Sequence, residues 1–176
     1  MPLRHQHHPE KYYLTVPFAE FPKRFGTHSH TSPRHMTVLP WFRLHRNNDI
    51  VPLMQELGNF CHAQEPFTVT FGDSKGYGPD GKEPGQPVVA GKDSVIALHC
   101  GLLAVVRRWA DVIDESWCGE SFDDPHSSLV DKEPFGCDPV GVWSVLVIGK
   151  FVKDEHRVND PDKEYSGGFR MRGRIN

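Results

Sequence analysis

Two short segments of the chain combine a histidine with a hydroxyl residue two positions later. His35 and Thr37 make the first pair, and His126 and Ser128 make the second. On a β-strand, residues i and i+2 point to the same face, so each imidazole would lie beside a hydroxyl group. Two such pairs could hold one phosphate group between them.

These four side chains meet the requirements of phosphoryl transfer. In-line attack at phosphorus needs a base for the incoming oxygen and an acid for the leaving oxygen, on opposite sides. Imidazole titrates near neutral pH, so two histidines can fill both roles. The hydroxyl groups can hydrogen-bond the non-bridging oxygens and stabilise the charge that develops there. Such chemistry requires no metal ion and no organic cofactor.

The H-x-[ST] pattern has low specificity when it stands alone. The chain contains 11 histidines, and roughly one chance match is expected. His30 begins a third match, but Pro33 follows it and no apolar alternation comes after. We therefore set this match aside and keep the two that precede apolar, strand-like segments, because their placement along the chain is rarely produced by chance.

Changes in hydrophobic period predict the elements that must position the two motifs. Period-two alternation predicts strands over residues 12–17, 35–40, 66–71, 86–90, 126–130 and 142–149, a short one at 94–97 and an edge strand within 165–176. Helical spacing predicts helices over 49–64, with Asn48 or Asp49 as N-cap, and over 99–114. Residues 72–85 are rich in Gly and Pro and predict an exposed loop or hairpin. The fold class is therefore α+β.

Length and composition favour one globular domain. The chain has 176 residues, which suffices for one well-buried core. We expect a flexible polar tail over residues 1–11 and a single domain over 12–176. With 38% hydrophobic and 24% charged residues, the composition is that of an ordinary globular protein. A net charge of -3 provides no overall attraction for polyanions, so any contact with nucleic acid would be local.

The sequence predicts neither a targeting signal nor a cysteine motif. No apolar run approaches the length of a membrane helix, and the polar, His-rich start lacks the apolar core of a signal peptide. The four cysteines lie far apart without a C-x-x-C pair, which argues against zinc ribbons and redox motifs. We expect a cytoplasmic protein that does not bind membranes, with a monomer as the expected state.

The two motifs resemble those of the 2H phosphoesterase superfamily, which includes RNA 2′,5′-ligase-like proteins and cyclic phosphodiesterases. Residues 35–42 are similar to the first family motif, an H-x-T with an apolar tail that often ends in Pro and Phe. Residues 124–129 are similar to the second, in which Pro commonly precedes the histidine. Residues 66–71 and 142–148 resemble supporting strands, so the likeness covers most of residues 12–151. The chain departs from the pattern in Ser128, where Thr is commoner, and in the long polar segment 21–34.

The resemblance implies a bilobal fold in which two β-rich lobes, with a helix each, flank a central cleft. It also implies a phosphodiesterase that acts on 2′,3′-cyclic phosphate or 2′,5′-phosphodiester linkages of RNA ends or small nucleotides. Carried over by position, His35 and His126 become acid and base, and Thr37 and Ser128 become phosphate ligands. Which histidine is the base, and whether the chain hydrolyses or ligates, stays open at this point.

Other residues are candidates for binding substrate. Trp41, Phe42 and Arg43 directly follow the first motif, where they could stack on a base or contact a phosphate at the cleft edge. Core packing is the alternative for at least one of these aromatic residues. The tail residues Arg170, Arg172 and Arg174 could contact an RNA backbone, but a solvated edge strand has the same pattern.

Two alternatives belong to different functional classes. A non-catalytic RNA-binding module of the same fold would keep the cleft but cleave no phosphoester. A metal-binding protein would use His28, His30 and His35, since H-x-H spacing on a strand can place two imidazoles on one metal ion. Against the metal site, no carboxylate or cysteine lies near these histidines in the sequence.

Overall fold

The computed structural model describes residues 11–18, 35–45, 49–78, 80–112, 122–128, 136, 140–142, 146–152 and 162–169. The tail was expected over 1–11, but Lys11 is the first residue of β1. Residues 1–10, the segment 21–34 and the three tail arginines lie outside the described ranges. The described strands are β1 (Lys11–Pro17), β2 (His35–Leu44), β3 (Phe67–Phe71), β4 (Lys75–Tyr77), β5 (Glu83–Ala90), β6 (Ala110–Val112), β7 (His126–Ser128), β8 (Val140–Val142), β9 (Leu146–Val152) and β10 (Asp162–Phe169), and the helices are α1 (Ile50–Ala63) and α2 (Lys92–Val106).

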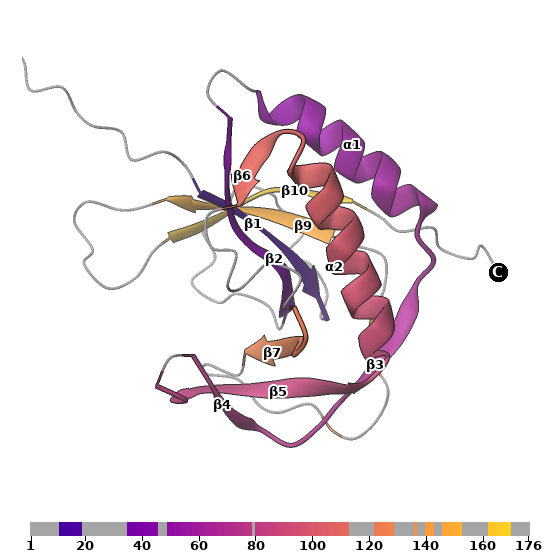
Figure 1. The fold of residues 1–176 in the computed structure, drawn as a ribbon, viewed down its shortest axis with the longest axis vertical. Coiled ribbons are helices and arrows are strands. Elements are labelled where there is room, and N and C mark those ends of the chain that lie inside the picture. The colour runs from indigo at the N-terminus through magenta and orange to yellow at the C-terminus, as the bar shows by residue number, and fades with distance from the viewer. Residues whose placement is uncertain are drawn as a thin grey trace, which may run out of the picture.

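The strands pair in the order β10-β9-β1-β2-β7-β5-β3-β8, with β4 beside β5 and β6 beside β2. All of these pairings are antiparallel. The long strands β1 and β2 run through the middle of the molecule, and β7 connects them to the β4–β5 hairpin below (Figure 1). The two motif strands, β2 and β7, are therefore direct neighbours although they are far apart in sequence.

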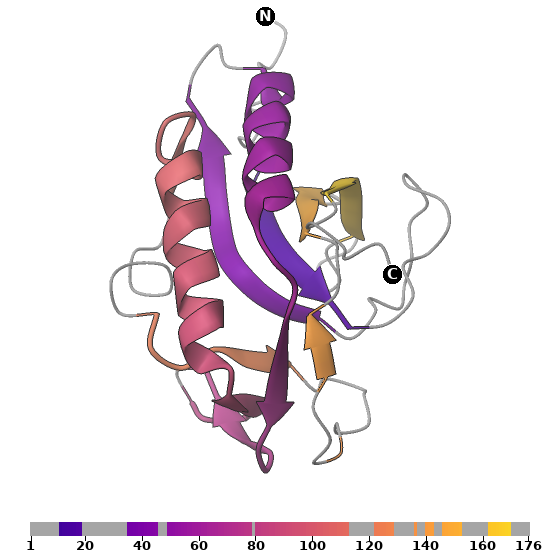
Figure 2. The ribbon, with the colours of Figure 1, turned by 90° about the vertical axis from the view of Figure 1, so that its right-hand side faces the viewer.

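Helices α1 and α2 contact each other and lie on the same side of the sheet, side by side in front of β2 (Figure 2). In α1, the side chain of Asp49 caps the first turn by accepting a hydrogen bond from the Val51 N–H at 3.1 Å. The helices approach closely where Gly101 faces Phe60, since a Cβ at Gly101 would lie 2.4 Å from that ring. A Cβ at Gly101 would therefore force the Phe60 ring to move.

The hydrophobic core lies between the helices and the face of the sheet that they cover. Its largest fully buried side chains include Leu14 and Phe42 from the sheet, Leu53 and Leu57 from α1, and Leu102 from α2. Burial of such side chains is the main force that holds the layers together, at about 1.5–3 kcal/mol for each one. The same layer fixes the position of β2, which carries the first motif.

The structure confirms the α+β class, the first helix and its Asp49 cap, and most of the expected strands. The expected exposed segment 72–85 contains β4 and the start of β5, which form a hairpin. The last strand, β10, lies at one end of the strand order, as an edge strand should. Among the described residues, no helix is long and apolar enough to span a membrane.

The second helix was predicted wrongly at both ends. It begins at Lys92, so residues 94–97 are helical rather than a strand, and it ends at Val106 rather than at Asp114. Gly91 precedes it with a φ of 78° and lies so close to the Thr68 carbonyl that a Cβ would be 2.2 Å from that oxygen. At the other end, β6 leaves the helical path because it pairs with β2. Tertiary pairing therefore overrides the local helical pattern.

Candidate functional site

The two H-x-[ST] motifs meet across one pair of neighbouring strands. Strands β2 and β7 run antiparallel, with Met36 opposite Ser127. Because the directions are opposed, the residue after Met36 faces the residue before Ser127, so Thr37 lies opposite His126. His35 lies diagonally from His126 on the same face of the sheet, at a Cα separation of roughly 7–8 Å.

The same register places His35 opposite Ser128, the hydroxyl residue of the second motif. The backbone of Ser128 is part of β7 and pairs on its other side with Gly85 of β5. The side chain of Ser128 lies outside the described part of the structure, so its predicted role as a phosphate ligand stays a prediction.

The residues between the histidine and the hydroxyl face the core. Met36 and Ser127 are both fully buried, and Gln86, which pairs with Ser127 on β5, is 3% exposed. Alternation along the strands then places His35, Thr37 and His126 on the opposite face, where all three are partly exposed. One face of these strands therefore builds the core, and the other presents the groups that can do chemistry.

A hydrogen bond joins the two motifs directly. The hydroxyl group of Ser127 donates to the backbone carbonyl of His35 at 2.9 Å. Ser127 and His35 are 92 positions apart in sequence, and Ser127, the donor, is fully buried. This bond fixes the first histidine relative to the second strand, because a buried hydroxyl that loses its partner is costly.

Two β-bulges in β2 follow the first motif and change which residues face the core. Thr15 of β1 pairs with Thr37, but the preceding Leu14 pairs with Leu39, so β2 has an extra residue. A second irregularity lies between Leu39 and Phe42. Bulges are common beside active sites, where they redirect side chains. Here they turn Leu39 and Phe42 toward the core.

Among the three candidate substrate contacts, the structure corrects the position of Phe42. This side chain is fully buried in the core and stacks on Tyr12 with ring centroids 5.8 Å apart, so it cannot reach a ligand on the motif face. Trp41 is partly exposed and makes an edge contact with Tyr13 at 5.4 Å, on the face that carries Thr37. It lies roughly 10–13 Å along the strand from Thr37.

Arg43 lies two residues beyond Trp41 on β2 and is partly buried. Its Nε atom is shielded from solvent and has no hydrogen-bond partner within the described residues. A buried guanidinium N–H group without a partner is unfavourable. The partly exposed guanidinium of Arg43 therefore stays a candidate contact for an anionic ligand, whereas the fully buried Phe42 does not.

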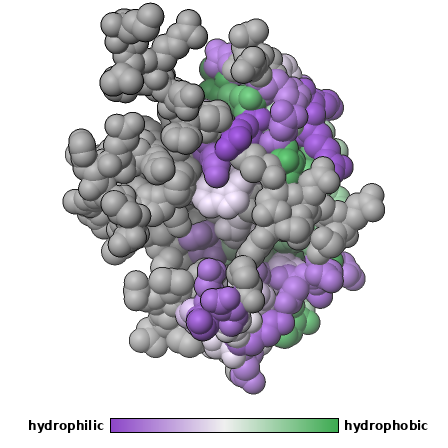
Figure 3. Space-filling view, turned by 60° about the vertical axis from the view of Figure 1, so that its left-hand side comes forward, coloured by the Kyte–Doolittle hydropathy of each residue, from purple (hydrophilic) through white to green (hydrophobic). Residues whose placement is uncertain are grey.

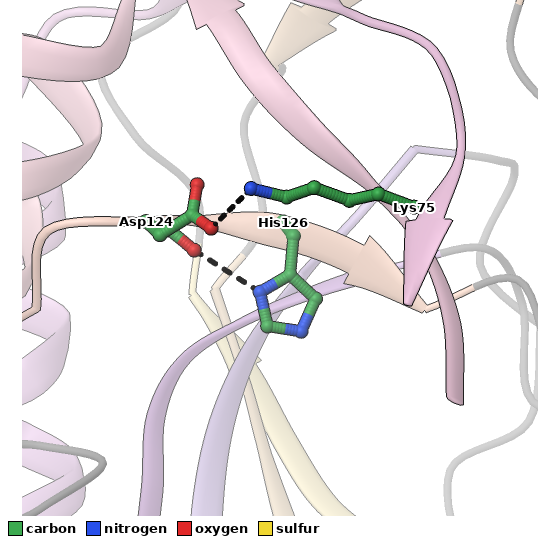
Figure 4. A network of polar contacts seen from close by, with 3 residues as sticks. All are labelled: Lys75, Asp124 and His126. Atoms are coloured by element: carbon green, nitrogen blue, oxygen red, sulfur yellow. Dashed lines mark hydrogen bonds and ion pairs between the residues drawn. The ribbon is translucent and has the colours of Figure 1, made fainter. Parts of the chain in front are cut away.

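His126 has a defined orientation. Its Nδ1 lies 3.1 Å from the backbone carbonyl of Asp124 (Figure 4). A carbonyl only accepts, so Nδ1 carries the proton in this bond, and the neutral ring presents a lone pair at Nε2. Burial lowers the pKa of His126 from its ordinary value, although the Asp124 carbonyl partly opposes this effect. The neutral imidazole is therefore favoured near pH 7.

Three residues around His126 had no predicted role: Tyr77, Lys75 and Asp124, the last of which begins the second motif. The ring of Tyr77 stacks on the imidazole, with centroids 3.6 Å apart and 14° between planes. Lys75 forms an ion pair with the Asp124 carboxylate at 2.7 Å (Figure 4). Lys75 and Tyr77 belong to the Gly-rich segment 72–85. Its composition predicts an exposed connection, but it does not predict that this connection contacts His126. Lys75 and Tyr77 are two positions apart, and this spacing on a strand would have placed both side chains on one face.

His99 is a buried residue that contacts the chain beside both motifs. This α2 residue is 1% exposed, and its Nδ1 lies 2.7 Å from the Val38 carbonyl, next to the first motif. Its ring also stacks on Phe122, which precedes the second motif, at 4.1 Å. One buried imidazole thus contacts the segments beside both motifs and helps to hold them in place.

The described residues contain no cluster of three His, Cys, Asp or Glu side chains that could hold a metal ion. Two of the histidines proposed for a metal site, His28 and His30, lie outside these residues, so that alternative stays untested.

The side of the molecule away from the helices carries a described surface that is mostly hydrophilic or intermediate in hydropathy (Figure 3). A polar ligand is compatible with such a surface.

The chain shares its fold with known structures, although its sequence differs from theirs. Escherichia coli LigT complexed with 3′-AMP superposes with a TM-score of 0.58 at 15% identity, over 93% of this chain and 99% of that one. A second structure, described as a phosphoesterase, has a TM-score of 0.56 at 14% identity and the same coverage. No protein-family model matches the chain, and no curated protein matches it either.

Proposed function

We propose that this chain is a phosphoesterase of the 2H type that opens 2′,3′-cyclic phosphates, or cleaves 2′,5′-phosphodiester linkages, on RNA ends or small nucleotides. The observation that carries the proposal is the pairing of the two motif strands, with Thr37 opposite His126 and His35 on the same face. The fold shared with LigT and with a phosphoesterase supports it. So does the ligand of the LigT structure, 3′-AMP, which carries its phosphate on the ribose.

In the proposed ring opening, His126 acts as the general base. Its neutral form is favoured by burial, and its Nε2 lone pair is free of the Asp124 bond. The Nε2 atom removes a proton from water as the water oxygen attacks phosphorus. The bond from phosphorus to one ribose oxygen breaks, and protonated His35 donates a proton to that oxygen. The product is a nucleoside monophosphate.

The remaining groups bind the substrate in this proposal. Thr37 donates a hydrogen bond to a non-bridging phosphate oxygen, and Ser128 does the same from the opposite strand. Trp41 provides a ring for stacking a base, and the partly exposed guanidinium of Arg43 binds an anionic oxygen at the far end of the strand. No step in this scheme uses a metal ion.

The test is a panel of 2′,3′-cyclic mononucleotides, a 2′,5′-linked dinucleotide and an RNA that ends in a cyclic phosphate, each incubated in excess EDTA. We expect turnover of at least one class, with a monoester phosphate detected by phosphorus NMR. Failure to turn over any member, together with measurable binding of the same RNA, would replace the proposal by the non-catalytic RNA-binding module.

The low pKa of His126 predicts how activity depends on pH. A base must be unprotonated, and the pKa of His126 lies below the usual 6.5 because of burial. The acid limb of kcat/KM should therefore lie below pH 6.5, and activity should persist in mildly acidic buffer. A pH profile with the best substrate of the panel checks this. An acid limb above pH 6.5 would contradict the assignment of His126 as the base.

A further inference from the structure

We propose that the β4–β5 hairpin is a positioning element for His126, in which the Tyr77 ring covers the imidazole and the Lys75–Asp124 ion pair holds the hairpin in place. The expected effect of the hairpin on turnover rests on the proposed function. The structural content of the inference, that Tyr77 controls the environment of His126, can be tested without any substrate.

The first argument is the contact itself. Tyr77 lies nearly parallel to His126 with ring centroids 3.6 Å apart. A parallel aromatic ring excludes water from one face of the imidazole and removes its freedom to rotate out of plane. With Nδ1 held by the Asp124 carbonyl, both the plane and the direction of the imidazole are defined. The position of Nε2 is then fixed as well.

Space for the Tyr77 ring depends on a glycine in the neighbouring strand. Gly85 pairs with Lys75 of β4 on one side and with Ser128 of β7 on the other. A Cβ at Gly85 would lie 2.7 Å from the Tyr77 ring. A side chain at this position would push the Tyr77 ring away from His126. Gly85 is therefore needed for the stacking of Tyr77 on His126.

The hairpin can adopt this position because its turn is closed tightly by glycines. A Cβ at Gly76 would lie 1.8 Å from the Gly81 carbonyl oxygen, and the φ angles of Gly78 and Gly81 are 78° and 63°. These φ values favour glycine over other residues. The sequence of the turn thus specifies a compact hairpin rather than a free loop.

Asp124 joins the hairpin to the histidine through two different groups. Its backbone carbonyl accepts the hydrogen bond from His126, while its carboxylate accepts from Lys75 at 2.7 Å (Figure 4). Lys75 also lies 5.1 Å from the Tyr77 ring centroid. The ion pair therefore connects β4 to the residue that sets the ring orientation of His126.

The groups that act on the charge of His126 come from several elements. Lys75 on β4, Glu83 on β5 and Asp124 in the preceding segment act through their charges. Tyr77 on β4 contacts the ring, and His35 on β2 lies diagonally from it on the same face. Lys75 disfavours the imidazolium, and Asp124 and Glu83 favour it. Burial raises the pKa of Tyr77 to about 12. A tyrosine is neutral at pH 7 even with its ordinary pKa, so the Tyr77 ring contributes mainly by excluding water.

The experiment combines an NMR titration of the His126 ring with steady-state kinetics in Tyr77→Ala and Tyr77→Phe. Removing the ring exposes the imidazole to water, so Tyr77→Ala should raise the pKa of His126 and lower kcat on the order of 10- to 100-fold with little change in KM. Tyr77→Phe keeps the stack and should restore kcat to within about threefold of the unmodified protein.

A second pair of variants tests the ion pair. Lys75→Met removes a cation and frees the Asp124 carboxylate, and both changes should raise the pKa of His126. Lys82→Met is the matched control, because Lys82 pairs with Asp80 in the same hairpin and is 81% exposed. The control should leave the His126 titration and kcat unchanged.

The proposal fails if Tyr77→Ala leaves both the His126 titration and kcat unchanged, or if Tyr77→Phe is as defective as Tyr77→Ala. A fall in the pKa of His126 in Tyr77→Ala would also overturn it, since the ring would then stabilise the imidazolium. If Tyr77→Ala does not fold, Gly85→Ala displaces the ring instead and should shift the titration in the same direction. The titration needs no turnover, so it decides this proposal even when the panel shows no activity.

Discussion

Replacing His126 with alanine is expected to reduce kcat for the opening of a 2′,3′-cyclic nucleotide by about 100- to 10,000-fold, the usual loss when a general acid or base is removed. The equivalent change at His35 should have an effect of similar size, because the leaving ribose oxygen would then lack the acid that protonates it. Both imidazoles are partly exposed on one sheet face, so neither replacement should unfold the protein.

The double replacement should be scarcely worse than either single one, since the two histidines act in one step and their effects are not additive. His62→Ala is the matched control, because His62 is an exposed residue of α1 that lies outside the site. Steady-state kinetics and circular dichroism of the four variants provide the measurement. Full activity in either single variant would disprove the two-histidine mechanism.

The second large effect is expected at Phe42, on stability rather than on binding. This side chain is fully buried and packs on Tyr12, so Phe42→Ala leaves a cavity and should lower the free energy of unfolding by about 3–5 kcal/mol. Denaturant unfolding measures the loss, and the KM of the folded fraction should stay close to that of the unmodified protein.

The neighbouring residue provides the contrast. Trp41 is partly exposed on the opposite face, so Trp41→Ala should cost only about 1 kcal/mol of stability. In the proposed function it should raise KM for substrates that carry a base. A large change in KM with little change in stability at Phe42 would reverse the assignment of these two aromatic residues.

Local patterns were sufficient wherever a single element decides the outcome. Helix α1 could be predicted, with Asn48 or Asp49 as its cap, because amphipathic spacing and N-capping act within a few residues; the structure has Asp49. The two motifs could be predicted because the i, i+2 geometry of a strand is independent of the rest of the fold. The same reasoning failed for Phe42, since the bulges of β2 arise from pairing with β1.

The sequence by itself therefore determined the fold class, the first helix and the strand segments that carry the two motifs. Only the tertiary structure decided that the two motifs are neighbours, that α2 ends before β6, and that Tyr77 lies on His126. The contacts behind these outcomes join distant positions: 92 residues separate Ser127 from His35, and 49 separate Lys75 from Asp124. Periodicity describes one element at a time, whereas such contacts depend on how the chain packs as a whole.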